Sequence, residues 1–106
     1  MKLSLLVVRC KDVEVSKSFY QLLGLSFVKE KHDNGPTHYS CEHGDFVFEL
    51  YPNKGESPLD NNRLGFKVSD INSVIKNVAI IDIYQFSGKT IHVTTDPDGR
   101  KVELSE

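Results

Sequence analysis

The chain has 106 residues and a mass of 12.0 kDa, so we expect a single domain over residues 1–106 rather than separate cofactor and substrate domains. Thirteen basic and fifteen acidic residues give a net charge of −2, without the basic excess that binding to a nucleic-acid backbone requires. No apolar run is longer than the four residues of 5–8, far short of the roughly 20 residues of a membrane helix, and no signal-peptide pattern is present. We therefore expect a cytoplasmic protein with neither a nucleic-acid nor a membrane partner.

The first half of the chain, about residues 1–52, predicts the order strand, helix, strand, strand, strand. An apolar stretch at residues 3–8 predicts the first strand, and Asp12 is expected to cap a helix that ends at Gly24. Four apolar residues at helical spacing predict the buried face of this helix: Val15, Phe19, Leu22 and Leu23. Strand-like runs follow at residues 25–31, 37–41 and 46–51.

A polar segment with two Pro, one Gly and three Asn, residues 52–62, predicts a linker at about residues 53–62. The second module, about residues 63–106, repeats the order of the first. A strand is predicted at residues 64–68, and a helix that starts at Ser69 or Asp70. The apolar face of this helix is Ile71, Val74, Ile75 and Val78. The last three strands are expected at residues 78–85, 90–95 and 100–104.

An internal repeat supports this division into two modules. Residues 37–50 align without a gap over residues 91–104, which places His38 over His92, Glu49 over Glu103 and Leu50 over Leu104. Chemically similar pairs such as Ser40/Thr94, Glu42/Asp96 and Phe48/Val102 strengthen the match, and the upstream elements occur in the same order. Internal duplication is the simplest interpretation.

Two separated segments resemble the vicinal oxygen chelate superfamily, which includes glyoxalase, bleomycin resistance proteins and extradiol dioxygenases. They are Ser-Lys-Ser-Phe-Tyr-Gln-Leu-Leu-Gly-Leu-Ser-Phe at residues 16–27 and Asp-Pro-Asp-Gly-Arg-Lys-Val-Glu-Leu at residues 96–104. The resemblance implies an α+β fold in which two βαβββ modules form a curved, cup-like mixed sheet. It also implies a homodimer. The stretch 78–88 is shorter than is usual in the family, so the second module is expected to be clipped and to leave apolar side chains uncovered.

The resemblance implies metal ligands on the first and last strands of each module. Glu49 and Glu103 occupy the last-strand positions, whereas Leu5 and Leu64 stand where histidines are expected. Leucine cannot coordinate a metal, and two carboxylates alone hold a cation weakly. No cofactor is therefore expected, and a divalent metal at a displaced site stays open as an alternative.

The repeat points to two His–Glu pairs as a second constellation. If each β-hairpin turn had four residues, His38 would lie opposite Glu49 and His92 opposite Glu103. Such pairs would act as acid/base dyads or as part of a displaced metal site, or would only neutralise carboxylates left by a lost metal site. A slip of one residue would place the histidines on the other face.

The leading hypothesis is a protein that binds a small molecule in the cup without the conventional metal site. Four residues are expected to line an apolar pocket on the face of the glutamates: Val7, Val47, Tyr51 and Phe66. The alternative is a metal-dependent lyase, isomerase or dioxygenase with a non-standard ligand set, or a metal-free acid/base catalyst. A regulatory interaction partner is the third possibility. Cys10 and Cys41 are expected to be free thiols, packed as small hydrophobic side chains.

Overall fold

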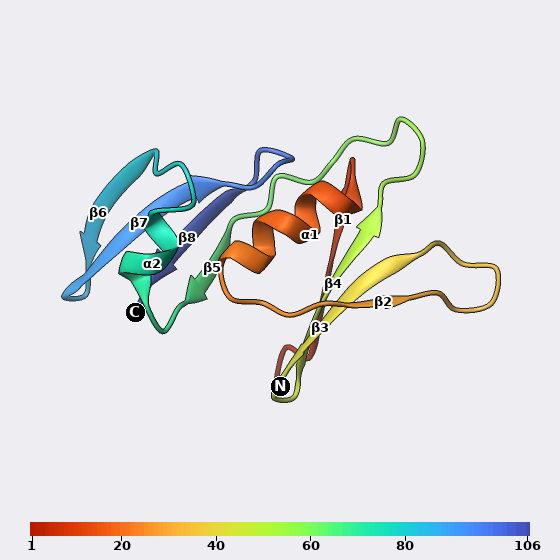
Figure 1. Cartoon of the computed structure of the whole chain (residues 1–106), viewed down its shortest axis with the longest axis horizontal. Helices are drawn as coiled ribbons and strands as arrows, with labels where there is room; N and C mark the ends of the chain where they lie inside the picture. The colour runs from red at the N-terminus through yellow and green to blue at the C-terminus, as the bar shows by residue number, and fades with distance from the viewer.

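Two four-stranded sheets, one from each half of the chain, lie side by side in the computed structural model, which describes residues 1–106 (Figure 1). The first half forms β1 (Leu5–Cys10), α1 (Val13–Leu22), β2 (Val28–Glu30), β3 (His38–His43) and β4 (Phe46–Pro52). The second half forms β5 (Leu64–Lys67), α2 (Ile71–Ile75), β6 (Asp82–Phe86), β7 (Lys89–Thr95) and β8 (Lys101–Ser105). The strand orders, β1-β4-β3-β2 and β5-β8-β7-β6, are equivalent, so the predicted pair of βαβββ modules is confirmed.

Each sheet is mixed, because its first and last strands pair in parallel and the other neighbours pair antiparallel. A parallel pair needs a crossover between its strands, and in each module the helix and the two strands that follow it in the chain supply this crossover. The helices of both modules therefore lie on one side of their sheets. The opposite face of each sheet carries Glu49 in β4 or Glu103 in β8.

Helix α1 begins and ends where the sequence predicts. The Asp12 carboxylate accepts hydrogen bonds from the backbone N–H groups of Glu14 and Val15, at 3.0 and 3.3 Å, which satisfies two free donors of the first turn. Gly24 follows the helix with a φ of +100°, a conformation that favours glycine. The predicted buried face is partly wrong, because Val15 is 51% exposed. The most buried side chain of the helix is instead Tyr20.

Helix α2 is shorter than the apolar periodicity predicts. It starts after Asp70, whose side chain accepts the backbone N–H of Ser73, but it ends at Ile75 rather than at Val78. Strand β6 starts at Asp82 rather than at residue 78, so residues 76–81 connect the two elements. Neither helix has the length or the apolar surface that crossing a membrane requires.

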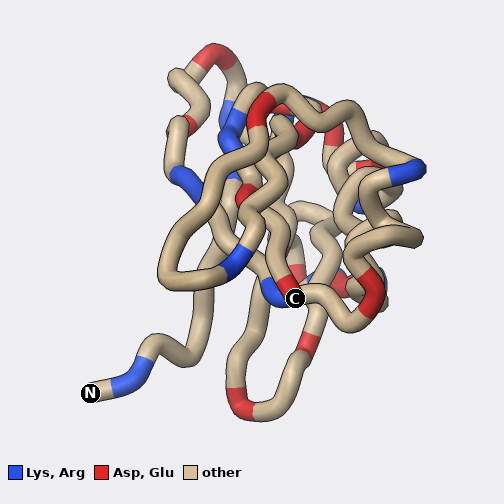
Figure 2. The backbone as a smooth tube through the Cα atoms, turned by 90° about the vertical axis from the view of Figure 1, so that its left-hand side faces the viewer, with Lys and Arg blue, Asp and Glu red and all other residues tan.

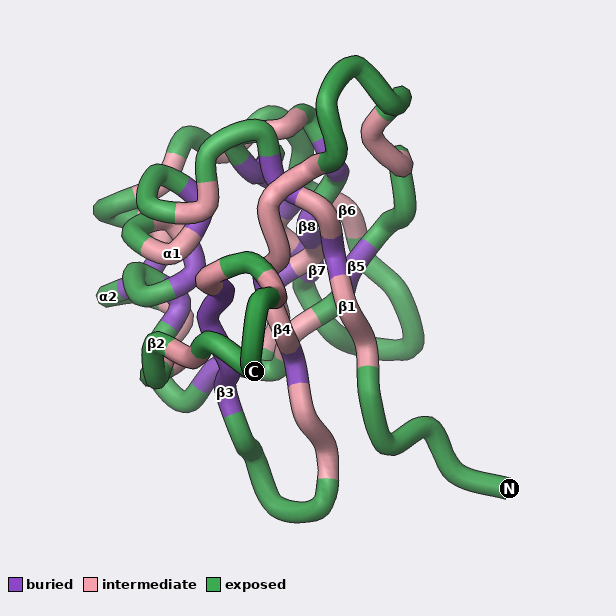
Figure 3. The backbone as a smooth tube through the Cα atoms, turned by 90° about the vertical axis from the view of Figure 1, so that its right-hand side faces the viewer, coloured by how far each residue is buried: buried purple, intermediate pink, exposed green.

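One hydrophobic core joins the two modules. The first module contributes fully buried strand residues such as Val8 and Leu50, and the second contributes Val102 and Leu104. Figure 3 shows the buried segments in the centres of the strands and in α1, while the N-terminal segment and the hairpin between β3 and β4 are exposed. Basic and acidic residues are interspersed along the backbone, so no long basic segment stands out (Figure 2).

The guanidinium group of Arg100 connects three segments at the boundary between the modules. It donates hydrogen bonds to Asp60 in the linker, to Asp96 and Asp98 in the β7–β8 turn, and to the backbone carbonyl of Arg9 in β1. The Arg100 side chain is completely buried. Because a buried guanidinium needs partners for its N–H groups, these contacts fix the linker and the turn against the first module.

Candidate functional site

The β3–β4 hairpin has a shorter turn than the sequence suggested, and this changes the partner of Glu49. His43 pairs with Phe46, so only Gly44 and Asp45 form the turn, and Ser40 rather than His38 lies opposite Glu49. The expected direct pairing of His38 and Glu49 is therefore wrong. A shift of two residues keeps a side chain on the same face. His38 accordingly stays close to Glu49, with 3.7 Å between Nε2 and Oε2.

The β7–β8 hairpin differs from the expected register by one residue, which separates its histidine from its glutamate. Val93 pairs with Glu103, and His92 pairs with Leu104. Because neighbouring residues of a strand point to opposite faces, His92 lies on the face opposite to Glu103. The second predicted His–Glu pair is wrong. The Nδ1 atom of His92 is buried without a hydrogen-bond partner.

Glu103 binds two side chains that the sequence did not link to it. The hydroxyl of Tyr84 donates a hydrogen bond of 2.6 Å to its carboxylate, and the guanidinium of Arg63 forms an ion pair with it. The donation from Tyr84 lowers the pKa of Glu103, and Arg63 lowers it further. Glu103 is thus held as a carboxylate by groups of its own module.

The four positions that the resemblance implies as metal ligands do not form one set. Leu64 pairs with Val102 and is buried in the core, so its assignment to the face of Glu103 is wrong; Gly65 lies opposite Glu103 instead. Leu5 is half exposed and pairs with Val47, on the Glu49 side. Since one carboxylate is bound to a guanidinium and neither leucine can donate a nitrogen, these residues do not fit a conventional metal centre.

His38 is the most enclosed polar group on the Glu49 face, with a side chain only 1% exposed. Its Nδ1–H donates to the backbone carbonyl of Pro36 at 3.2 Å. Its Nε2 lies 3.3 Å from Glu30 Oε1 and 3.3 Å from the Tyr51 hydroxyl, and the Tyr51 ring stacks on the imidazole at 4.1 Å. Glu30 Oε1 also lies 3.8 Å from Nε2 of the exposed His32.

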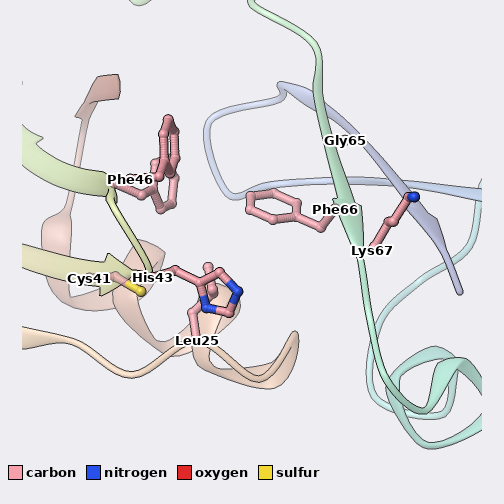
Figure 4. A pocket seen from close by; sticks show the side chains of 8 residues that line it. Leu25, Cys41, His43, Phe46, Gly65, Phe66 and Lys67 are labelled. Atoms are coloured by element: carbon pink, nitrogen blue, oxygen red, sulfur yellow. The ribbon is translucent and has the colours of Figure 1, made fainter. Parts of the chain in front are cut away.

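An apolar hollow lies between the two modules. It is a cavity of about 330 Å³ in which aromatic side chains from the first module face β5 (Figure 4). It is lined by Leu25, Cys41, His43, Phe46, Phe48, Gly65, Phe66 and Lys67. A neighbouring hollow of about 410 Å³ shares Phe46, Phe48, Gly65 and Phe66 and extends towards Leu3 and Leu6. We call these two hollows together the inter-module groove.

The structure divides the four expected lining residues between two surfaces. Val7 pairs with Glu49, and Val47 and Tyr51 lie two residues on either side of Glu49 in β4, so these three share the glutamate face. Phe66 instead pairs with Leu104, and its ring packs against Phe48 at 5.9 Å. Its placement on the glutamate face is therefore wrong. Figure 4 shows the Phe66 ring directed from β5 towards Phe46 and His43 across the groove.

Comparisons with known proteins agree with the paired modules. The family model of the Glyoxalase/Bleomycin resistance protein/Dioxygenase superfamily matches residues 2–104. Among solved structures, TnmS3, an antibiotic binding protein from Streptomyces sp. CB03234, has a TM-score of 0.77 and 18% identity, covering 99% of this chain and 94% of that chain. Lactoylglutathione lyase from Agrobacterium tumefaciens has a TM-score of 0.70 and 16% identity, covering 99% and 92%.

A glyoxalase family protein from Enterococcus faecalis has a TM-score of 0.68 and 23% identity, covering 99% of this chain and 97% of that chain. No curated protein sequence matches the chain significantly. At these identities the solved structures establish the fold, whereas activity has to be argued from the site itself.

Proposed function

The chain belongs to the glyoxalase/bleomycin resistance protein/dioxygenase superfamily, and we propose that it binds a small, flat, largely apolar molecule in the inter-module groove. The groove itself carries this proposal. Its volume and its apolar lining with a few polar groups are typical of small-molecule sites. Phe46, Phe48 and Phe66 offer ring faces and edges, which favours an aromatic ligand.

His43 and Lys67 supply the polar contacts of the proposed site. Both residues line the groove, and both are exposed at its opening. An acceptor or a negative charge on the ligand would be stabilised there, while the apolar part lies against the aromatic rings. The likeness in fold to an antibiotic binding protein is compatible with binding as the whole function. Binding of this kind needs no metal at Glu49 or Glu103.

An aromatic anion that becomes fluorescent in apolar surroundings, anilinonaphthalene sulfonate, tests the proposal. We expect saturable binding to the wild-type protein, and Phe46→Ala should weaken it about tenfold, since an aromatic contact contributes about 0.5–1.5 kcal/mol beyond its buried area. Phe86→Ala is the matched control, because Phe86 lies outside the groove and is 66% exposed.

A second variant tests the groove from the side of the second module. Phe66 lines both hollows, and its ring is directed across the groove. Phe66→Ala should therefore also weaken binding of the probe. If neither Phe46→Ala nor Phe66→Ala lowers the affinity below that of Phe86→Ala, the groove is not the binding site and the proposal fails.

An enzyme with a non-standard ligand set is the second candidate, and the polar cluster around His38 favours it. In this alternative the protein is a metal-dependent lyase, isomerase or dioxygenase, and the turnover of a substrate would require that cluster. Substitutions at Glu30 or His38 would then abolish activity, whereas in the binding proposal they leave the affinity of the groove for its ligand unchanged. We also propose that the protein forms a homodimer.

A further inference from the structure

We propose that Glu30, His32 and His38 bind one first-row divalent transition-metal ion at the β2–β3 edge of the first sheet. One ligand atom from each residue, a carboxylate oxygen or a ring nitrogen, lies within 4.8 Å of the other two. The site uses the second and third strands of the module and the connection between them. It is therefore separate from the first-strand and last-strand positions that the family resemblance implies, and from the inter-module groove.

The spacing of the three side chains is close to that of a metal coordination shell. With metal–ligand bonds of about 2.0–2.2 Å, two ligands of a tetrahedral zinc ion lie about 3.3 Å apart. Nε2 of His38 lies 3.3 Å from Oε1 of Glu30, and Nε2 of His32 lies 3.8 Å from the same oxygen. Only the exposed His32 side chain has to move to complete the set. Two imidazoles and a carboxylate suit zinc, nickel or iron better than magnesium or calcium.

A hydrogen bond to the backbone orients His38 so that its Nε2 atom can bind a metal ion. Because a carbonyl can only accept, the hydrogen bond to Pro36 fixes the proton on Nδ1 and leaves the Nε2 lone pair directed at the cluster. Metal-binding histidines usually have their second nitrogen held in this way. Register supports the arrangement as well, since Glu30 and His38 are directly paired in the β2–β3 ladder.

The carboxylates around Nε2 of His38 favour a bound cation. Glu30 and Glu49 both direct carboxylate oxygens at this atom, at 3.3 and 3.7 Å, and their side chains are 35% and 15% exposed. Two carboxylates beside a lone pair repel one another and the ring nitrogen unless a positive charge lies between them. A metal ion held by Glu30, His32 and His38 supplies that positive charge. A hydrogen bond from the Tyr51 hydroxyl to Nε2 is the competing arrangement.

Metal binding to the chelator-treated protein separates these two arrangements. In equilibrium dialysis against Zn²⁺ we expect one equivalent per chain, and with Co²⁺ we expect the visible absorption of a site with nitrogen ligands. Glu30→Gln and His32→Ala should each weaken Zn²⁺ binding by about tenfold or more. Both residues are at or near the surface, so folding is retained and circular dichroism checks it. Glu42→Gln removes an exposed carboxylate of β3 outside the cluster and should leave the affinity unchanged.

Stability gives an independent readout, because an ion that binds only the folded protein raises its melting temperature. Zn²⁺ should raise the Tm of the wild type but not that of the Glu30→Gln/His32→Ala double variant. His43 and His92 are retained in every variant, so a loss of binding cannot come from scattered surface histidines. If the double variant binds Zn²⁺ as tightly as the wild type, or if Co²⁺ develops no absorption with either protein, the cluster holds no metal ion and the proposal is overturned.

Discussion

The hydroxyl of Tyr20 donates a 2.7 Å hydrogen bond to the carboxylate of Asp96, two residues that are 76 positions apart in the chain. Tyr20 belongs to α1 of the first module, and Asp96 begins the β7–β8 turn of the second. The other Asp96 oxygen accepts the backbone N–H groups of Asp98 and Arg100, so one carboxylate both forms the turn and attaches it to the other module. The modules are therefore joined by specific polar contacts as well as by a shared core.

Loss of the Tyr20 hydroxyl should destabilise the protein without changing its fold. Tyr20→Phe keeps the aromatic ring and leaves a buried carboxylate with one hydrogen bond fewer, which corresponds to a loss of about 1–2 kcal/mol in the free energy of unfolding. Urea unfolding followed by circular dichroism measures this change. Tyr84→Phe removes a hydroxyl that binds the less buried Glu103 and should have the smaller effect. Equal effects of the two substitutions would contradict the role of the Tyr20–Asp96 bond.

The Asp60–Arg100 ion pair predicts a specific loss of stability in acid. Hydrogen bonding to Arg100 lowers the pKa of Asp60 below its ordinary value of 3.8. A group whose pKa is lower in the folded state contributes stability that is fully present above its unfolded pKa, about 4, and is lost as the pH falls through the folded pKa. In urea titrations, Asp60→Asn should be less stable than the wild type at neutral pH, and this difference should shrink below about pH 4. A difference that stays constant down to the lowest pH would count against the pair.

Cys10 should resist alkylation in the native protein. Its side chain is fully buried, and burial raises the pKa of the thiol to about 11, so almost no thiolate forms at mildly alkaline pH. Iodoacetamide at about pH 8, followed by peptide mass spectrometry, should leave Cys10 unmodified in native protein and modify it fully in concentrated urea. Modification of native Cys10 at the rate of a free thiol would show that β1 opens readily.

Much of the fold could be predicted because the signals that define it are local. Asp12 and Asp70 start the two helices through their own side chains, and strand-like runs gave most strands to within a few residues. The register of the paired strands was harder to predict, since it depends on the number of residues in each hairpin turn. The β7–β8 turn includes Arg100, whose backbone bonds to Asp96 and whose side chain is held by Asp60. This additional turn residue places His92 on the face opposite to Glu103. A local sequence pattern gives no sign of the contact between Arg100 and Asp60.

The candidate sites depend on contacts of the same non-local kind. Glu30 and His38 meet because β2 and β3 pair directly, while Phe66 joins the groove because its strand packs against the first module. The repeat correctly singled out His38 as a residue close to Glu49. It could not identify Glu30 or His32, which have no counterpart in the second module that would mark them.

The edge strand β6 predicts self-association. It is the last strand of the second sheet, so its outer backbone groups have no partner within the chain, and exposed edges of this kind pair readily with another strand. Ile81, which directly precedes β6, and Ile83 within it are each 55% exposed. Covering both with a second copy would remove an apolar surface from water, so light scattering at micromolar concentration should give about twice the chain mass of 12.0 kDa.

A charge placed on β6 or on β2 shows whether the dimer uses one of these two edge strands. Ile83→Lys should convert the dimer to a monomer, because a buried lysine without a partner at the interface is costly. The matched control is Val28→Lys, which adds the same charge to β2, the outer strand of the first sheet, at a residue that is 64% exposed. If β6 forms the interface, only the first variant becomes monomeric. A wild type that stays monomeric at high concentration, or a dimer that only Val28→Lys dissociates, would assign the exposed isoleucines of β6 to solvent instead.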